Sequence, residues 1–185
     1  MTDTFPRLDF DASDPQVQAL LKPVVERLGY YGDFFQVVGH LPDALVAFMD
    51  YTGTVKSPLT MRQNEVLALS TCTAAGGDYE RIQHERLALK SGLDKDWIAE
   101  LTGHASPKPS TLSEEDAALR DLAVAVVSRD GRAVGTEIDI VNLLLGPEKT
   151  VAVILQITRF QMISTLNKMF AMTLPVASIF DQAEG

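Results

Sequence analysis

The sequence predicts an all-α protein, a single-domain bundle of about eight or nine helices over residues 1–185. Two observations predict this fold class. Residues that typically begin and end helices recur along the chain, and the longest stretch without glycine or proline has helical spacing of its apolar residues. Hydrophobic residues make up 46% of the chain and charged residues 22%, as in folded globular domains.

The first helix is expected to begin at Asp14-Pro15, because aspartate caps a first turn and proline needs no N–H partner there. It should run towards Gly29, with a kink or a division at Pro23. The next two helices are expected over residues 34–38 and 43–55, with a turn between them that contains proline.

The middle of the chain predicts a pair of helices joined by a tight turn. Thr60 is a typical helix cap, and Gly76-Gly77 ends the helix that it begins. Asp78 begins the next helix, which should run to the Ser-Gly pair at residues 91–92. A short helix over residues 94–101 follows.

The second half begins with a loop over residues 103–110, which resembles a hinge between two helical halves. Ser113 is a typical cap for a helix that runs through Arg129. A shorter helix is expected over about residues 137–145, although the alternating isoleucines there could also form a strand.

The last helix is expected over residues 148–174, because its length is too great for one strand. Its apolar spacing is also helical, at Val151, Leu155, Thr158, Met162, Leu166 and Met169. Further apolar residues lie off this stripe, so the helix is apolar on most faces and needs cover on most faces. Another subunit could supply that cover, as could the rest of the same chain. We expect a homo-oligomer.

The charge of the chain argues against nucleic acid as a partner. Sixteen Lys and Arg stand against 25 Asp and Glu, for a formal net charge of −9. Binding to DNA or RNA depends on clustered cations, and the sequence has no basic cluster.

We expect a cytoplasmic protein without a membrane span. The only cysteine is Cys72, which excludes an intramolecular disulfide and fits a reducing compartment. The first residues lack the cationic start and apolar run of a secretory signal. No stretch approaches the 18 uninterrupted apolar residues that would predict a transmembrane helix.

Three ionisable residues have a spacing that suits proton transfer. Glu65 lies on the apolar face of its helix, so its carboxyl is expected to be partly buried. Glu80 and His84 stand four residues apart, on one face of the next helix. If the glycine pair lets the two helices pack antiparallel, both carboxyls come close to the imidazole. Such a group can hold and pass a proton.

Two other interpretations of the same residues stay open. A Glu–His pair at this spacing is commonly a solvated ion pair on a helix surface, worth a few tenths of a kcal/mol. Glu65, Glu80 and His84 are also metal-ligand types, but zinc and iron sites usually contain a second histidine, and none is near in sequence. We therefore expect no metal at these residues.

The stretch RQNEVLALSTCTAAGGDYERIQHERLALKSGL, within a core motif at residues 60–93, resembles the core of the carboxymuconolactone decarboxylase and alkylhydroperoxidase-D superfamily. That core has a Glu, eleven residues, Cys-x-x-Cys, three residues and a His. Glu65 and His84 match its Glu and His. Residues 34–49 resemble the preceding helical hairpin, and residues 112–175 resemble the helical extension. The resemblance implies a trimer, hexamer or dimer.

The chain departs from the family's peroxidases at both cysteine positions, which Gly77 and Glu80 occupy. Cys72 lies five residues before Gly77, so it replaces neither thiol, and a small helical cysteine is usually a core residue. The chain is therefore similar to the cysteine-free branch of the family. This resemblance implies a site that retains the Glu and the His and that needs no metal and no organic cofactor.

Three functions follow as hypotheses. In the leading one, the chain is an enzyme that carries out acid–base chemistry on a small organic molecule, such as decarboxylation, isomerisation or lactone handling, with Glu65, Glu80 and His84 as catalytic residues. In the second, it is an alkylhydroperoxidase-like, peroxiredoxin-type antioxidant protein that uses Cys72. In the third, it is a helical assembly module without catalytic activity.

Other polar residues carry weaker expectations. Arg62 lies one turn before Glu65 and could bind a substrate carboxylate, or could be a surface cation early in its helix. His40 precedes a turn and is expected to be structural. His104 lies in the predicted loop and has no expected partner.

Overall fold

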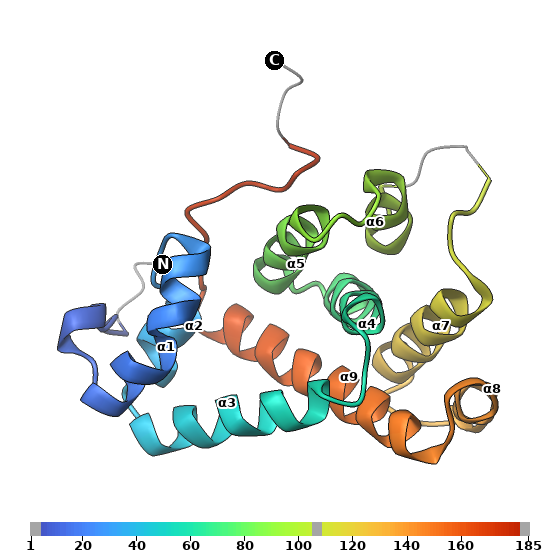
Figure 1. Cartoon of the computed structure of the whole chain (residues 1–185), viewed down its shortest axis with the longest axis horizontal. Helices are drawn as coiled ribbons and strands as arrows, with labels where there is room; N and C mark the ends of the chain where they lie inside the picture. The colour runs from blue at the N-terminus through green and yellow to red at the C-terminus, as the bar shows by residue number, and fades with distance from the viewer. Residues whose placement is uncertain (1–4, 105–108, 182–185) are drawn as a thin grey trace.

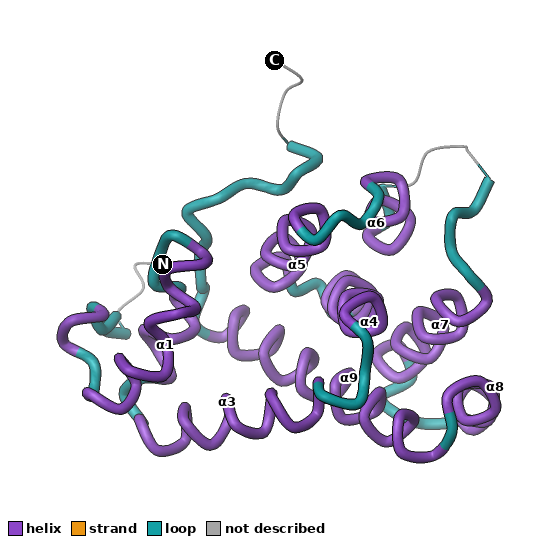
Figure 2. Tube along the Cα trace, viewed as in Figure 1, coloured by secondary structure: helices purple, strands orange, loops and turns teal. Residues whose placement is uncertain are grey.

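The computed structural model describes residues 5–104 and 109–181, and within these every regular element is a helix (Figures 1 and 2). The prediction of an all-α fold is confirmed. A short 3₁₀ helix at Phe10–Ala12 precedes the α-helices and was not predicted. The α-helices are α1 (Pro15–Leu28), α2 (Asp33–Val38), α3 (Pro42–Lys56), α4 (Met61–Ala74), α5 (Asp78–Lys90), α6 (Lys95–Thr102), α7 (Glu114–Ser128), α8 (Gly135–Leu145) and α9 (Pro147–Met169).

Local sequence signals explain where several helices begin. Asp14 caps α1 by accepting a hydrogen bond from the backbone N–H of Gln16, as predicted. Thr60 and Ser113 cap α4 and α7, and in both the side chain three residues later bonds back to the cap, which forms a capping box. These caps act within one turn, so their effect can be seen in the sequence.

The structure shows no division at Pro23, confirms one predicted helix and shortens another. Helix α1 continues through Pro23, which is exposed, and is not divided there. The short helix predicted over residues 137–145 is confirmed as α8. Helix α9 ends at Met169, five residues before the predicted end, because Ala171 has a φ of +46° and Met172 donates its N–H back to the carbonyl of Asn167.

Helix α4 lies at the centre of the molecule, surrounded by α5, α6, α7 and α9 (Figure 1). Every residue from Gln63 to Cys72 is buried, so α4 has no solvent-facing side over those three turns. Two groups of buried apolar residues meet along it. One joins α4 to α6, α7 and α8, the other joins α4 to α1, α2 and α3, and α9 contributes to both.

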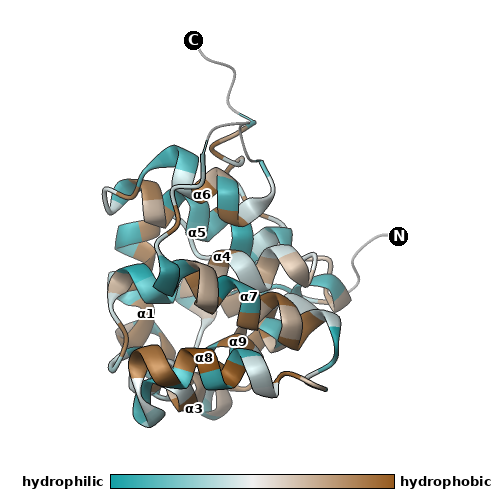
Figure 3. Cartoon of the chain, turned by 90° about the vertical axis from the view of Figure 1, so that its right-hand side faces the viewer, coloured by the Kyte–Doolittle hydropathy of each residue, from teal (hydrophilic) through white to brown (hydrophobic). Residues whose placement is uncertain are grey.

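The apolar stripe that predicted α9 lies on the exposed side of the helix. Val151, Leu155, Met162 and Met169, whose spacing predicted the helix, are exposed. The buried face instead includes Phe160, which was expected to lie off the stripe. Exposed apolar residues continue onto α8, which Figure 3 shows beside α9, and Leu143 there is 86% exposed. Among the described helices, none combines the length and apolar character that crossing a bilayer requires.

The loop predicted as a hinge lies partly outside the described residues, at 105–108. The helix that follows it, α7, packs closely on α4. The two predicted halves therefore share one packed interface.

Candidate functional site

A cavity of about 550 Å³ lies among α1, α2, α3, α4, α5 and α9. Val176 and Ile179, from the segment after α9, also line it. Its wall is partly aromatic, and it carries several ionisable side chains, among them Arg27, Lys56, Glu65, Glu80, His84 and Arg159. All three residues expected to transfer protons are thus on the wall of one cavity.

Glu65 and His84 are in hydrogen-bond contact, with Nδ1 of His84 2.8 Å from Oε2 of Glu65. Helices α4 and α5 pack against each other after a tight turn, in which Gly76 has a φ of +62°, a conformation that favours glycine. Because a carboxylate oxygen only accepts, Nδ1 of His84 is the donor. In the neutral ring, Nε2 therefore carries the lone pair.

Glu80 lies on the other side of the same imidazole. Its Oε2 is 3.7 Å from Nε2 of His84, which is close but longer than a hydrogen bond. Burial raises the pKa of Glu80 above the ordinary range of a glutamate, although the charges of His84 and Arg159 act in the opposite direction. A carboxyl that holds its proton more tightly than usual therefore lies next to the free nitrogen of the imidazole.

The ring of His84 is fixed by a second contact. Phe160 of α9 meets it edge to face, with the ring centres 5.1 Å apart and the planes at 88°. The side chain of His84 remains 18% exposed, while those of Glu80 and Glu65 are 13% and 5% exposed. Within residues 5–104 and 109–181, no three His, Cys, Asp or Glu side chains are placed to hold a metal ion.

Arg159 is a residue of the site that the sequence analysis did not identify. It lies on the buried face of α9 and is only 8% exposed. Its Nε donates to Oε1 of Gln156 at 2.6 Å, and Gln156 in turn donates to Oδ1 of Asn64 at 2.5 Å. Its guanidinium carbon is 4.0 Å from the centre of the Phe160 ring. The sequence feature that could have identified Arg159 is its position as a charged residue within an otherwise apolar stretch.

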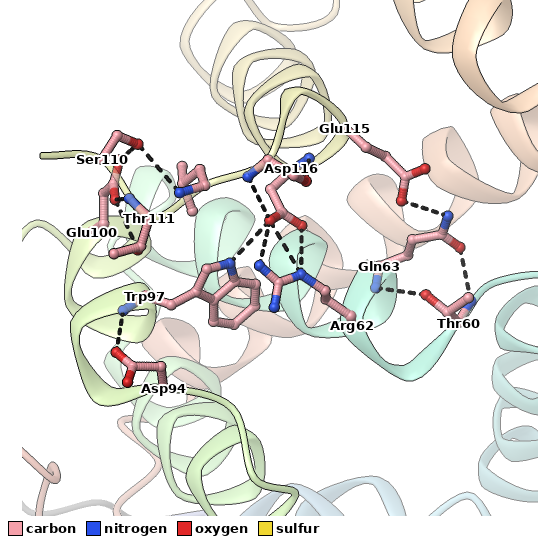
Figure 4. Close-up of polar contacts among 12 residues, drawn as sticks. Thr60, Arg62, Gln63, Asp94, Trp97, Glu100, Ser110, Thr111, Glu115 and Asp116 are labelled. Carbon is pink, nitrogen blue, oxygen red and sulfur yellow. Dashed lines mark hydrogen bonds and ion pairs between the residues drawn. The ribbon is translucent and has the colours of Figure 1, made fainter.

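Arg62 lies outside this cavity. Figure 4 shows its guanidinium against Asp116 of α7, which accepts from Nε at 3.0 Å and from Nη2 at 2.6 Å. Asp116 also accepts from Nε1 of Trp97 at 3.2 Å, and Arg62 covers the ring of Trp97. The structure thus gives Arg62 a role in joining α4 to α6 and α7, in place of the substrate contact considered from the sequence.

Cys72 is fully buried and does not line the cavity. Burial raises the pKa of its thiol far above the usual range, so it stays protonated. At Gly77, where peroxidases of the resembled family have a cysteine, a Cβ atom would lie 2.3 Å from Oγ of Ser164. The space for a side chain at that position is therefore filled by α9.

The other two histidines lie away from the cavity. Nε2 of His40 is 3.0 Å from the carbonyl oxygen of Pro6, which fits the expected structural role. Nδ1 of His104 is 3.0 Å from Oγ1 of Thr102, and its ring stacks on Phe180 at 4.4 Å. His104 thus has partners that the sequence did not predict.

Comparison with known proteins places this geometry among related folds. The model of the carboxymuconolactone decarboxylase family matches residues 40–120. A variant of the debrominase Bmp8 in complex with 2,3,4-tribromopyrrole is similar in structure, with a TM-score of 0.81, 16% identity, and coverage of 95% of this chain and 94% of that one. A peroxidase-related protein from Ralstonia eutropha JMP134, described as an alkylhydroperoxidase AhpD core, has a TM-score of 0.78, 14% identity, and coverage of 91% and 90%.

A third solved structure is a protein of unknown function from Agrobacterium tumefaciens, described as a putative antioxidant defence protein AhpD. It has a TM-score of 0.65 and 20% identity, and covers 74% of this chain and 93% of its own. No curated protein matches the sequence significantly. At these identities, the structural likeness shows the fold.

Proposed function

We propose that the cavity is an active site for proton transfer on a small organic molecule, since residues 40–120 match the model of the carboxymuconolactone decarboxylase family and the fold is similar to that of alkylhydroperoxidase-D-like proteins. The observation that supports this is the arrangement of Glu65, His84 and Glu80. One carboxylate fixes the imidazole through Nδ1, and the other stands near Nε2, on the wall of the cavity. Decarboxylation, isomerisation and lactone handling all need such a group.

In the proposed reaction, Nε2 of His84 removes a proton from the substrate and becomes an imidazolium ion. Glu65 stabilises that charge through the 2.8 Å contact at Nδ1. Glu80, whose pKa burial raises, holds a proton more readily than an ordinary glutamate and can return one to another atom of the substrate. A proton then passes from Nε2 of His84 to Oε2 of Glu80, which lies 3.7 Å away, and this restores both groups for another turnover. None of these steps needs a metal or an organic cofactor.

The test compares proton exchange in variants of the site with that in a matched control. The protein is incubated in D₂O with a panel of small 3-oxo acids and unsaturated lactones, and deuterium incorporation is followed by mass spectrometry. His84→Ala and Glu65→Gln should abolish incorporation with the fold intact, while His104→Ala, outside the cavity, should keep it. Full activity in both site variants would rule out this assignment.

A thiol-based peroxidase is the second enzyme considered, and the surroundings of Cys72 do not favour it. The thiolate is the form that attacks a hydroperoxide, and this thiol is buried, protonated and off the cavity. Equal rates of hydroperoxide reduction by wild type and Cys72→Ser would exclude the thiol. A clear loss in Cys72→Ser would support it.

The hypothesis of a non-catalytic assembly module would be supported if Glu80 and His84 were fully exposed, with no pocket beside them. Both side chains are instead mostly buried on a cavity wall, which supports the enzyme. A small-molecule substrate, no nucleic-acid partner and a cytoplasmic location remain proposals that rest on composition: a net charge of −9 and one cysteine.

We also propose that the chain forms a homo-oligomer through the exposed face of α9. One row of its exposed positions has steps of four and three residues in alternation, at 151, 155, 158, 162, 165 and 169. This is the spacing of a two-helix seam. In an antiparallel pair of such helices, Val151 would face Met169 of a second copy, and Thr158 would face Met162, so the face is complementary to itself.

A further inference from the structure

We propose that Arg159, with Lys56 and Arg27 beside it, forms a binding subsite for the carboxylate of an organic acid with an aromatic or apolar body. The subsite lies in the same cavity as Glu65, Glu80 and His84. The proposal extends the proposed function by naming the class of substrate. The subsite proposal rests on the proposed function only in calling the ligand a substrate, because binding of the ligand can be measured without any reaction.

Arg159 supplies the main observation, because it is a buried cation whose terminal nitrogens have no protein partner. Its side chain is held through Nε by Gln156 and by the face of Phe160. Among the described residues, neither Nη1 nor Nη2 has a hydrogen-bond acceptor, and no carboxylate pairs with it directly. Burying an unpaired charge is costly. The planar edge of a guanidinium matches the two oxygens of a carboxylate.

Lys56 and Arg27 add positive charge near the same point. Lys56 ends α3 and Arg27 lies in the last turn of α1, so three separate helices bring these cations to one cavity. Partial desolvation lowers the pKa of Lys56, the charges of Arg159 and Arg27 lower it further, and the charge of Glu65 acts in the opposite direction. Lys56 thus experiences repulsion from both arginines. An anion bound among them would relieve that repulsion.

The charge of the cavity wall is opposite to that of the whole chain. Five cationic residues line the cavity, including Arg86 and Lys90, against the two carboxyls Glu65 and Glu80, while the protein as a whole carries −9. A binding site with local positive charge attracts anions even in an acidic protein.

The rest of the wall indicates the body of the ligand. Phe34, Phe35, Phe48 and Phe160 line the cavity, and its volume of about 550 Å³ suits a small organic ligand. Only Arg159 among the cations is buried. One buried guanidinium beside aromatic walls fits a singly charged carboxylate on an apolar body better than a phosphate dianion, which is more strongly hydrated.

The experiment measures binding of benzoate by titration calorimetry, with its neutral isostere benzamide and with inorganic phosphate. Benzoate should bind wild type about tenfold or more tightly than benzamide, and Arg159→Gln should lose a similar factor. Arg120→Gln, at an arginine paired with Asp121 away from the cavity, is the matched control and should bind benzoate as wild type does. Lys56→Gln, at an exposed residue, should weaken binding severalfold and provides a second variant if Arg159→Gln does not fold.

His84→Ala separates this proposal from the proposed function. It should keep benzoate binding even if it abolishes proton transfer, so failure of the reaction and failure of the subsite give different results. Three outcomes would overturn the subsite: equal binding of benzoate and benzamide, unchanged benzoate binding in Arg159→Gln, or phosphate binding that is tighter than benzoate binding.

Discussion

Replacing Gly77 by alanine should destabilise the fold, because Ser164 of α9 already fills the space that the new methyl group needs. A Cβ atom at residue 77 would lie 2.3 Å from Oγ and 2.7 Å from Cβ of Ser164, well inside van der Waals contact. The backbone itself does not demand glycine, since φ at Gly77 is −100°. The expected cost is therefore steric. Overpacking of this kind costs about 1–3 kcal/mol, which lowers Tm by roughly 2–12 °C in a chain of this size.

Thermal and urea unfolding of Gly77→Ala would measure this cost. Gly53→Ala is the control for added bulk, because Gly53 lies within α3 and a Cβ there would meet nothing within 4 Å. That change should leave stability equal or raise it by up to about 1 kcal/mol. Adding Ser164→Gly to Gly77→Ala should recover part of the loss, in a double-mutant cycle. If Gly77→Ala is as stable as wild type, or if Ser164→Gly recovers nothing, the steric argument is wrong.

Three further predictions concern the site, the core and the surface. Because the pKa of Glu80 is raised in the folded state, stability falls as pH rises from about 4.3 through that raised value. Glu80→Gln should therefore raise Tm more at pH 8 than at pH 4, and an equal change at both would contradict this. Asp116→Ala should cost about 1.5–3 kcal/mol in urea unfolding at pH 7, because it leaves Arg62 and Trp97 without their acceptor, whereas Asp121→Ala, at an exposed carboxylate, should cost little. Met162→Glu should convert the oligomer to a 20.2 kDa monomer in light scattering, and wild type that is already monomeric would refute the α9 interface.

The sequence was sufficient where the cause of a structure lies within a few residues. Thr60 and Ser113 bond to groups three residues away, so the starts of α4 and α7 could be predicted. The contact between Glu65 and His84 could also be expected, because one tight turn joins the two helices that carry them.

The sequence was not sufficient where a contact joins distant parts of the chain. Arg62 was open to a role in substrate binding because its partner, Asp116, lies 54 residues away. Arg159 reaches the cavity only because α9 packs beside α4 and α5. The apolar stripe of α9 predicted a helix but did not predict which face of it is buried, because that depends on which neighbouring helices cover it.

The most direct test of the proposed proton transfer is the tautomer of neutral His84, which long-range ¹H–¹⁵N spectra of histidine-labelled protein can report. The His84→Gln variant identifies its signal among the three histidines. The proton should reside on Nδ1, held by Glu65, with Nε2 free to accept a proton from a substrate. In Glu65→Leu this preference should disappear. A neutral His84 that carries its proton on Nε2 in the wild-type protein would contradict the proposed role of the site.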